Sequence, residues 1–224
     1  MYSGQAEQDK FVLHTLKEKR NGFFLEIGSN DPIFINNTYL LEKQYDWKGI
    51  MIEYDGRYLS SYKEHRPNSI HVINDATTID YKQLFETNNV PLSIDYLQID
   101  LEPANGSTLQ TLQKLDNDVL DNYKFATVTF EHDIYNKNFE HYTFEQKTNF
   151  INTQLISREI FQKRGYYCVF QDISNGGNPY EDWYVHPDLV DMNYIKNLVE
   201  NNKQFYVDHP ITEKTLSWTD IKYD

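Results

Sequence analysis

Short apolar runs that end in a polar or acidic residue recur along the chain, and the segments between them have helical spacing. This alternation is typical of an α/β fold, in which strands and crossover helices follow one another. The expected strands are Gly22–Gly28, Gly49–Glu53, Ile70–Asn74, Tyr96–Asp100, Ala126–Phe130, Tyr166–Gln171 and Trp183–His186. The first five are far enough apart for crossovers, so they predict a parallel sheet.

Helical spacing is clearest in three of the intervening segments. Thr38–Gln44 and Thr108–Leu115 carry leucines on one face and are expected to be crossover helices. Glu145–Arg164 is the longest, with an expected buried stripe of Phe150, Ile151, Leu155, Ile160 and Phe161. Only the turn-forming stretch Asn175–Pro179 separates the last two strand candidates, which therefore predict an antiparallel hairpin.

Length and charge limit the classes of protein that this chain can belong to. Its 224 residues suit one α/β domain, so we expect residues 1–224 to form a single domain. The net charge of −13 disfavours a nucleic-acid backbone as partner. No apolar run approaches the roughly 20 residues of a membrane span, and the first residues lack the pattern of a secretory signal. We therefore expect no membrane association and a cytoplasmic location.

The stretch Glu26–Asp31 directly follows the first strand candidate. In an open α/β sheet, the turn after the first strand is where a nucleotide-like ligand binds, and Gly28 lets the backbone approach such a ligand. Glu53 ends the second strand, where a carboxylate can accept hydrogen bonds from both ribose hydroxyls. Together these features predict a nucleoside-containing cofactor, and the plainer alternative for Glu53 is an ordinary solvated acid at a strand end.

Several motifs together resemble the FkbM-type methyltransferases. They are Gln8–Val12, Gly22–Gly28, Asn37–Thr38 with Leu41–Lys43, Trp47–Gly49 with Ile52–Glu53, the D-x-E stretch Asp95–Glu102, and Glu181–Pro187. This resemblance implies a single Rossmann-like class I methyltransferase domain. Its mostly parallel seven-stranded sheet would end in a C-terminal antiparallel hairpin and carry helices on both faces.

The resemblance also implies S-adenosyl-L-methionine as the methyl donor, together with the residues that hold it. Glu26, Gly28, Ser29 and Asn30 would lie beside its methionine portion, Glu53 on its ribose, Asp75 and Ala76 beside its adenine, and Asp100 near the transferring methyl. Asp75 can instead cap the following turn through its side chain. The chain departs from the family pattern at Pro32 and Pro103, where members often carry glycine.

Acids and a histidine follow the fourth and fifth strand candidates. The carboxyl ends of neighbouring strands converge, so Asp100, Glu102, Glu131, His132 and Asp133 are expected to share a volume near the transferring methyl. His132 can then act as general base. Alternatively, Asp100 with Glu131 or His132 can hold Mg²⁺ or another divalent cation. The plainer interpretation is that these groups cap helices and form ion pairs.

The sequence therefore predicts an S-adenosylmethionine-dependent methyltransferase that acts on an oxygen of a small molecule or carbohydrate. The alternative is a Rossmann-like binding or interaction module without catalysis, which the two missing glycines favour. A nicotinamide-dependent oxidoreductase is disfavoured because the full glycine-rich fingerprint is absent.

Overall fold

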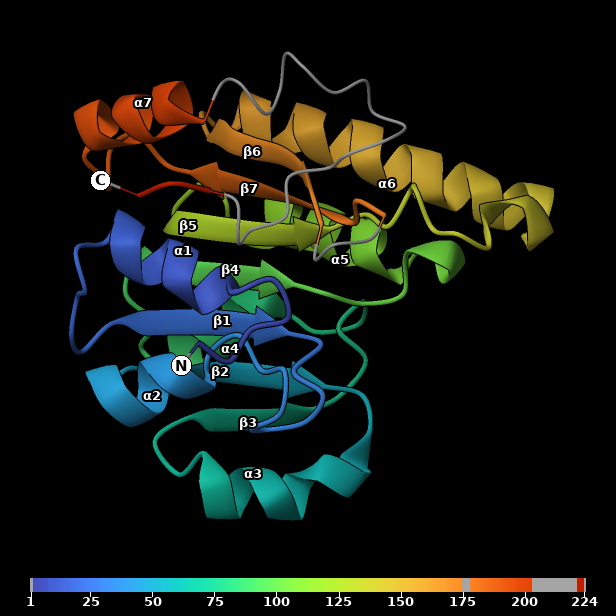
Figure 1. Ribbon diagram of the computed structural model, residues 1–224. Coiled ribbons are helices and arrows are strands. Elements are labelled where there is room, and N and C mark those ends of the chain that lie inside the picture. The colour runs from blue at the N-terminus through green and yellow to red at the C-terminus, as the bar shows by residue number, and fades with distance from the viewer. Residues whose placement is uncertain (1, 175–177, 203–220, 224) are drawn as a thin grey trace.

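The computed structural model describes residues 2–174, 178–202 and 221–223. Seven strands form one sheet in the order β3-β2-β1-β4-β5-β7-β6 (Figure 1). They are β1 (Phe23–Ile27), β2 (Lys48–Glu53), β3 (Ile70–Ile73), β4 (Ser93–Ile99), β5 (Lys124–Glu131), β6 (Tyr167–Ile173) and β7 (Glu181–Val185). The first five pair in parallel, while β7 runs antiparallel to both β5 and β6.

This sheet confirms the fold predicted from the apolar runs. Each expected strand is present within a few residues of its predicted bounds, and the last two form the predicted antiparallel pair. Of the predicted turn between them, Asn175, Gly176 and Gly177 lie outside the described residues. No helix in the described part of the chain is both long and apolar enough to span a bilayer.

Helices cover both faces of the sheet (Figure 1). One apolar core includes side chains of α1 (Gln8–Thr15), α2 (Tyr39–Tyr45), α3 (Leu59–His65) and α7 (Met192–Asn201). The core on the opposite face includes side chains of α4 (Tyr81–Thr87), α5 (Ser107–Asp118) and α6 (Phe144–Lys163). Short 3₁₀ turns lie at Gly56–Tyr58, Pro103–Asn105 and Phe139–His141.

The buried face of α6 differs from the predicted stripe. Phe150, Ile160 and Phe161 are buried as expected, but Ile151 is 41% exposed and Leu155 is 53% exposed. At about 100° per residue, positions 151 and 155 lie roughly 100° and 140° around the helix from Phe150. Small and polar side chains complete the buried face instead, namely Thr153, Gln154 and Ser157.

A fully buried arginine joins α3 to the loop that follows β1. The guanidinium of Arg66 donates to Glu42 Oε2 (2.8 Å), to Asn36 Oδ1 (2.8 Å) and to Thr38 Oγ1 (2.6 Å). Neither side chain of the Arg66–Glu42 pair is exposed to solvent. A buried charge is tolerated only when it is paired and hydrogen-bonded, so this contact fixes the loop relative to α2 and α3.

We expect Arg66→Met to lower the free energy of unfolding by about 3 to 5 kcal/mol, because the Glu42 carboxylate would stay buried without its cation. Urea denaturation measures this change. The matched control is Arg20→Met, which breaks the exposed pair with Asp46 and should cost less than about 1 kcal/mol. Equal losses in the two variants would contradict the role of the buried pair.

Candidate active site

A cavity of about 770 Å³ opens at the carboxyl ends of β1, β2 and β4. This edge of a parallel sheet is where α/β folds bind their ligands. Six of the eight residues predicted to hold the cofactor line it, namely Glu26, Gly28, Ser29, Asn30, Glu53 and Asp100. A second hollow of about 710 Å³ beside α4 and α5 contains none of them.

Gly28 brings the turn after β1 against the end of β4. Its φ of +84° lies in the left-handed region that favours glycine. A Cβ atom at this position would lie 1.7 Å from the carbonyl oxygen of Asp100. The floor of the cavity is therefore backbone, and any side chain at position 28 would force the two strand ends apart.

Glu53 is held at the mouth of the cavity by two backbone amides. Its Oε2 accepts from the amide of Asn30 (2.8 Å) and its Oε1 from the amide of Asp55 (2.9 Å). The carboxylate thus links the turn after β1 to the turn after β2. This arrangement differs from a freely solvated acid, because both oxygens are oriented by the loops that line the cavity.

Two buried oxygens on the cavity wall have no hydrogen-bond partner among the described residues. They are Oε1 of Glu26 and Oε1 of Gln98, on side chains that are 1% and 4% exposed. Burial raises the pKa of Glu26, and the nearby charge of Arg66 opposes that shift. Buried polar atoms normally have partners, so this wall suits a ligand that donates hydrogen bonds, such as an ammonium group.

The residues predicted to contact adenine do not line this cavity. Asp75 Oδ1 accepts from the amide of Thr77 (2.9 Å) and from its hydroxyl (2.7 Å), which is the turn-capping alternative. Ala76 is 6% exposed and belongs to the core. Both residues lie in the turn before α4, and the amide of Asn74, one residue earlier, donates to the carbonyl of Glu53 (3.0 Å).

Three carboxyl groups form a row across β4, β5 and β7. Ile99 is in register with Phe130, which sets Asp100 beside Glu131, and Glu131 is in register with Glu181. Burial raises the pKa of Asp100 at one end of this row. Burial and the charge of Asp100 raise the pKa of Glu131, and burial raises that of Glu181 to about 8. We call Asp100, Glu131 and Glu181 the acid row.

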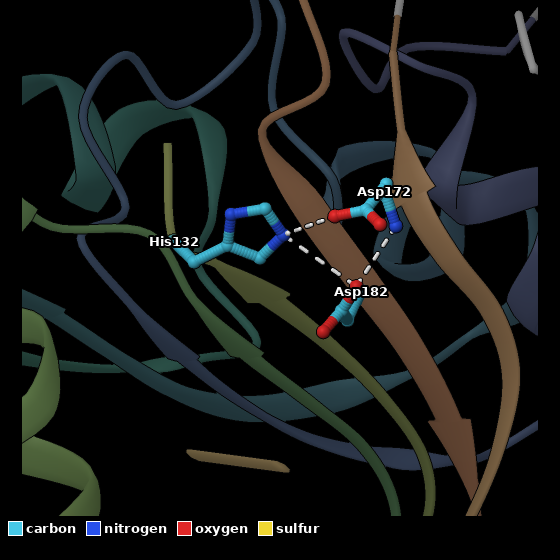
Figure 2. Close-up of side chains that lie close together, drawn as sticks. All are labelled: His132, Asp172 and Asp182. Atoms are coloured by element: carbon cyan, nitrogen blue, oxygen red, sulfur yellow. Dashed lines mark hydrogen bonds and ion pairs between the residues drawn. The ribbon is translucent and has the colours of Figure 1, made fainter. Parts of the chain in front are cut away.

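His132 was predicted to lie beside Asp100 and Glu131, but the structure places it elsewhere. Its ring is fully buried, and Nε2 lies 3.5 Å from Oδ1 of Asp172 and 3.5 Å from Oδ1 of Asp182 (Figure 2). Successive residues of a strand point to opposite faces, so Glu131 and His132 at the end of β5 diverge. The predicted volume shared by Asp100, Glu131 and His132 is therefore not formed.

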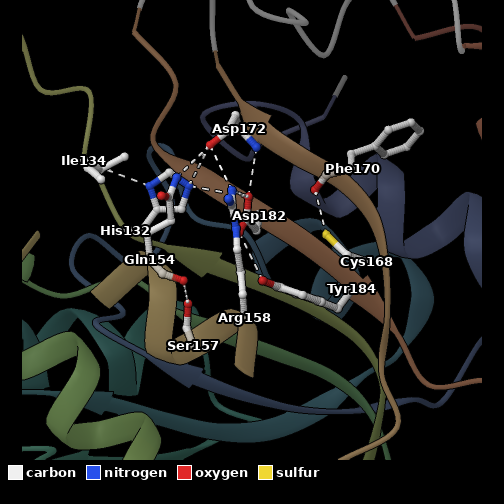
Figure 3. Close-up of polar contacts among 10 residues, drawn as sticks. All are labelled: His132, Ile134, Gln154, Ser157, Arg158, Cys168, Phe170, Asp172, Asp182 and Tyr184. Atoms are coloured by element: carbon white, nitrogen blue, oxygen red, sulfur yellow. Dashed lines mark hydrogen bonds and ion pairs between the residues drawn. The ribbon is translucent and has the colours of Figure 1, made fainter. Parts of the chain in front are cut away.

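Arg158 of α6 joins this second cluster (Figure 3). It donates to both oxygens of Asp182 (2.8 and 3.0 Å) and to Oδ1 of Asp172 (3.0 Å). Burial alone would raise the pKa of Asp182, but hydrogen bonds and charge from His132 and Arg158 outweigh it and hold that pKa well below its usual range.

The spacing of this second cluster would allow a metal ion, because one ligand atom from each of His132, Asp172 and Asp182 lies within 4.8 Å of the others. However, Oδ1 of Asp172 also accepts from Gln154 (3.0 Å), and Oδ1 of Asp182 from the amide of Asp172 (2.8 Å). Donors already occupy both oxygens and a guanidinium supplies the positive charge. The cluster is thus built to join α6 to β6 and β7.

Sequence reasoning missed several residues that shape the cavity. Arg66 and Asn36 set the loop after β1, yet neither belongs to a recognised motif. Gln98 was visible as a polar residue inside an apolar strand, two positions before Asp100, where side chains face the same way. Glu181 was noted only as part of a motif, because its neighbour on β5 depends on the register of an antiparallel pair.

No family model and no curated protein sequence match this chain. Solved structures do, among them the cofactor-bound Rv0187 from MTB, with a TM-score of 0.53 and 14% identity over 80% of this chain and 79% of that one. A putative rRNA-methylase from Clostridium thermocellum has a TM-score of 0.50 and 10% identity, with 82% and 96% covered.

A TehB-like SAM-dependent methyltransferase from Corynebacterium glutamicum has a TM-score of 0.46 and 11% identity, with 82% of this chain and 87% of that one covered. At such identities the similarity shows the fold alone. The chain has the Rossmann-like methyltransferase fold that was predicted, whereas the narrower FkbM-type resemblance stays a prediction.

Glu181→Gln should flatten the dependence of stability on pH between about pH 5 and 8. The unfolded chain releases this proton near the ordinary glutamate pKa of about 4.3, whereas the folded chain keeps it up to about pH 8. The proton-linked stability is therefore complete below the unfolded pKa and is lost as pH rises through the folded pKa. Across three pH units the loss is at most roughly 4 kcal/mol.

Urea denaturation at pH 5, 6.5 and 8 measures this slope in the wild type and in Glu181→Gln. The exposed Glu86 on α4 provides the control variant Glu86→Gln, which should keep the slope of the wild type. Parallel stability profiles for all three proteins would show that Glu181 does not retain its proton in the folded chain.

Proposed function

We propose that this chain is an S-adenosylmethionine-dependent methyltransferase that transfers a methyl group to an oxygen of a small molecule or carbohydrate. The observation that carries the proposal is the cavity at the carboxyl ends of β1, β2 and β4 in a methyltransferase fold. We further propose that residues 1–224 act as one domain and that the chain is of the FkbM type, on the motifs from Gln8 to Glu53.

The hydrogen-bonding groups that line the cavity suit the cofactor. The unpartnered oxygens of Glu26 and Gln98 would accept from the ammonium of its methionine portion. Glu53 would accept from the ribose hydroxyls, with its carboxylate already aimed by two backbone amides. Gly28 would leave room for the ligand against the backbone of Asp100.

When bound, S-adenosylmethionine supplies a methyl group on a sulfonium, and transfer breaks its S–C bond and forms an O–C bond on the acceptor. The acceptor hydroxyl must then lose its proton. We assign that proton to Asp100, which lines the cavity and whose pKa is raised by burial. His132 is directed at Asp172 and Asp182, so we do not carry its predicted general-base role into this proposal.

Apart from removing this proton, the protein would only have to hold the acceptor oxygen in line with the methyl group of the cofactor. The version of the divalent-cation alternative that uses His132 loses support, because His132 lies apart from Asp100 and Glu131. A small or carbohydrate acceptor is supported by the net charge of −13, which disfavours a phosphate backbone.

A non-catalytic binding module was favoured by the two prolines at glycine positions. Both are accommodated, since the carbonyl of Pro32 accepts from Arg66 (3.3 Å) and Pro103 begins a short 3₁₀ turn capped by Glu102. Cofactor binding without turnover on any acceptor would nevertheless support the module.

Glu53→Ala should weaken the binding of S-adenosylhomocysteine at least tenfold. A charge-assisted hydrogen bond of this kind contributes roughly 1.5 to 3 kcal/mol, and the variant also removes the link between Asn30 and Asp55. Isothermal titration calorimetry measures the affinity. Glu86→Ala on the opposite face of the sheet serves as control and should bind as the wild type does. Unchanged affinity in Glu53→Ala would remove the ribose assignment.

A further inference from the structure

The loop after β1 carries three consecutive apolar side chains at the surface. Ile33 is 38% exposed, Phe34 72% and Ile35 47%. Phe34 and Ile35 also line the cavity, beside the residues proposed to hold the cofactor. Single exposed apolar residues are ordinary, whereas an exposed apolar patch rimmed by polar residues marks a binding surface. The position of this patch at the cavity makes it part of the proposed active site.

The loop is held in one shape by hydrogen bonds on both sides of Phe34. Before it, Oδ1 of Asp31 accepts from the amides two and three residues later (2.9 and 2.7 Å). The buried guanidinium of Arg66 donates to the carbonyl of Pro32 (3.3 Å) and to Oδ1 of Asn36 (2.8 Å). The apolar side chains are therefore presented by a fixed backbone.

Ile35 gives an independent indication that this surface serves a ligand. Its φ of +53° lies in the left-handed region, which asparagine and glycine adopt far more readily than a β-branched residue does. Burial does not compensate this strain, because nearly half of the side chain is exposed. Backbone strain of this kind is characteristic of functional sites, so the apolar side chain itself is what this position provides.

Phe34 and Ile35 also differ in chemistry from most of the cavity lining. The groups proposed to hold the methionine and ribose portions of the cofactor are polar, as Glu26 and Glu53 are. Leu101, another aliphatic residue of the lining, packs against the core. The exposed side chains of Phe34 and Ile35 thus offer contact to a ligand group that makes no hydrogen bonds.

We infer that Phe34 and Ile35 form an apolar subsite for the acceptor, which carries an aryl ring or an alkyl chain next to the hydroxyl that is methylated. The inference rests on the proposed function and narrows its substrate class to hydroxylated small molecules and glycosides with such a group. Covering the patch removes apolar surface from water, and the contact holds the acceptor beside the cofactor.

A small ligand fits this patch better than a macromolecule does. A specific protein interface takes about 800 Å² and about 20 to 30 residues from each partner, whereas the patch consists of neighbouring side chains in one loop. An anionic bilayer attracts basic surfaces, but this chain has a net charge of −13, and Asp31 and Asp55 line the same cavity. The opening of the patch into the cavity favours an occupant that also reaches the cofactor.

The test compares matched ligands on the protein loaded with S-adenosylhomocysteine. Phenyl β-glucoside is paired with methyl β-glucoside, and 2-phenylethanol with ethanol, and ligand-observed NMR titration measures each affinity. We expect the phenyl ligand to bind at least tenfold more tightly in at least one pair, because its ring is removed from water. Equal affinities within both pairs would overturn the inference.

Variants locate the ring. Phe34→Ser should reduce the preference for the phenyl ligand at least fivefold, while the affinity for S-adenosylhomocysteine changes less than twofold. The matched control is Phe144→Ser, which removes another exposed phenylalanine, at the start of α6 and outside the cavity lining, and should retain the preference. A preference that survives in Phe34→Ser would overturn the inference. A larger loss of S-adenosylhomocysteine affinity would assign Phe34 to the cofactor, with the same consequence.

Ile35→Asn separates a ligand-binding role from a structural one. Asparagine tolerates the left-handed backbone, so the variant should unfold at a higher urea concentration than the wild type. The preference for the phenyl ligand should nevertheless decrease at least threefold, because an apolar contact is lost. A lower urea midpoint would show that Ile35 serves the fold and would overturn its assignment to the subsite.

Two further measurements test other occupants of the patch. Analytical ultracentrifugation detects self-association, and co-sedimentation detects binding to vesicles of phosphatidylcholine and phosphatidylglycerol. Either one, if present in the wild type and lost in Phe34→Ser, would overturn the inference. Failure of S-adenosylhomocysteine to bind the wild type would refute the proposed function instead. In that case the same ligand pairs on the free protein still decide whether Phe34 and Ile35 bind an apolar group.

Discussion

The arrangement of the cavity depends on one buried guanidinium. Arg66 directly follows α3, and its donors are matched by acceptors from the loop after β1 and from α2. Through Asn36 the same network reaches Glu26 (3.3 Å) and the carbonyl of Ser29 (3.0 Å). An unpaired guanidinium in the core would cost several kcal/mol, so the loop has little freedom to take another shape. The side of the cavity lined by Glu26, Ser29 and Asn36 is therefore fixed by contacts within the protein.

Two arginines supply the counter-charge for buried carboxyl groups of this molecule. The clusters around Arg66 and Arg158 supply the cations for their buried acids and join elements that are distant in sequence. The acid row has no such ion pair among the described residues, and burial raises the pKa of each of its three carboxyl groups.

Much of the fold could be predicted because its determinants are local. Buried parallel strands have to be apolar throughout, and the residues that end them are polar because the sheet edge is solvated, so runs such as Gly49–Glu53 indicate both a strand and its end. The six predicted residues that reach the cavity follow β1, β2 and β4 directly or lie in them. Asp75 and Ala76 do not line the cavity. The carboxylate of Asp75 caps its own turn by accepting hydrogen bonds from Thr77, and the local sequence allowed either this contact or a contact with the cofactor.

The sequence by itself determined the order of strands and helices along the chain, the antiparallel pairing of the last two strands, and which strands end in acidic residues. These follow from side-chain period, chain length between runs, and composition. Only the tertiary structure decided which acids meet. Glu131 faces Asp100 while His132, one residue later, turns to Asp172 and Asp182, because alternation along β5 and the register of β7 act together. The pairing of side chains across strands distant in sequence depends on that register, and no local pattern encodes it.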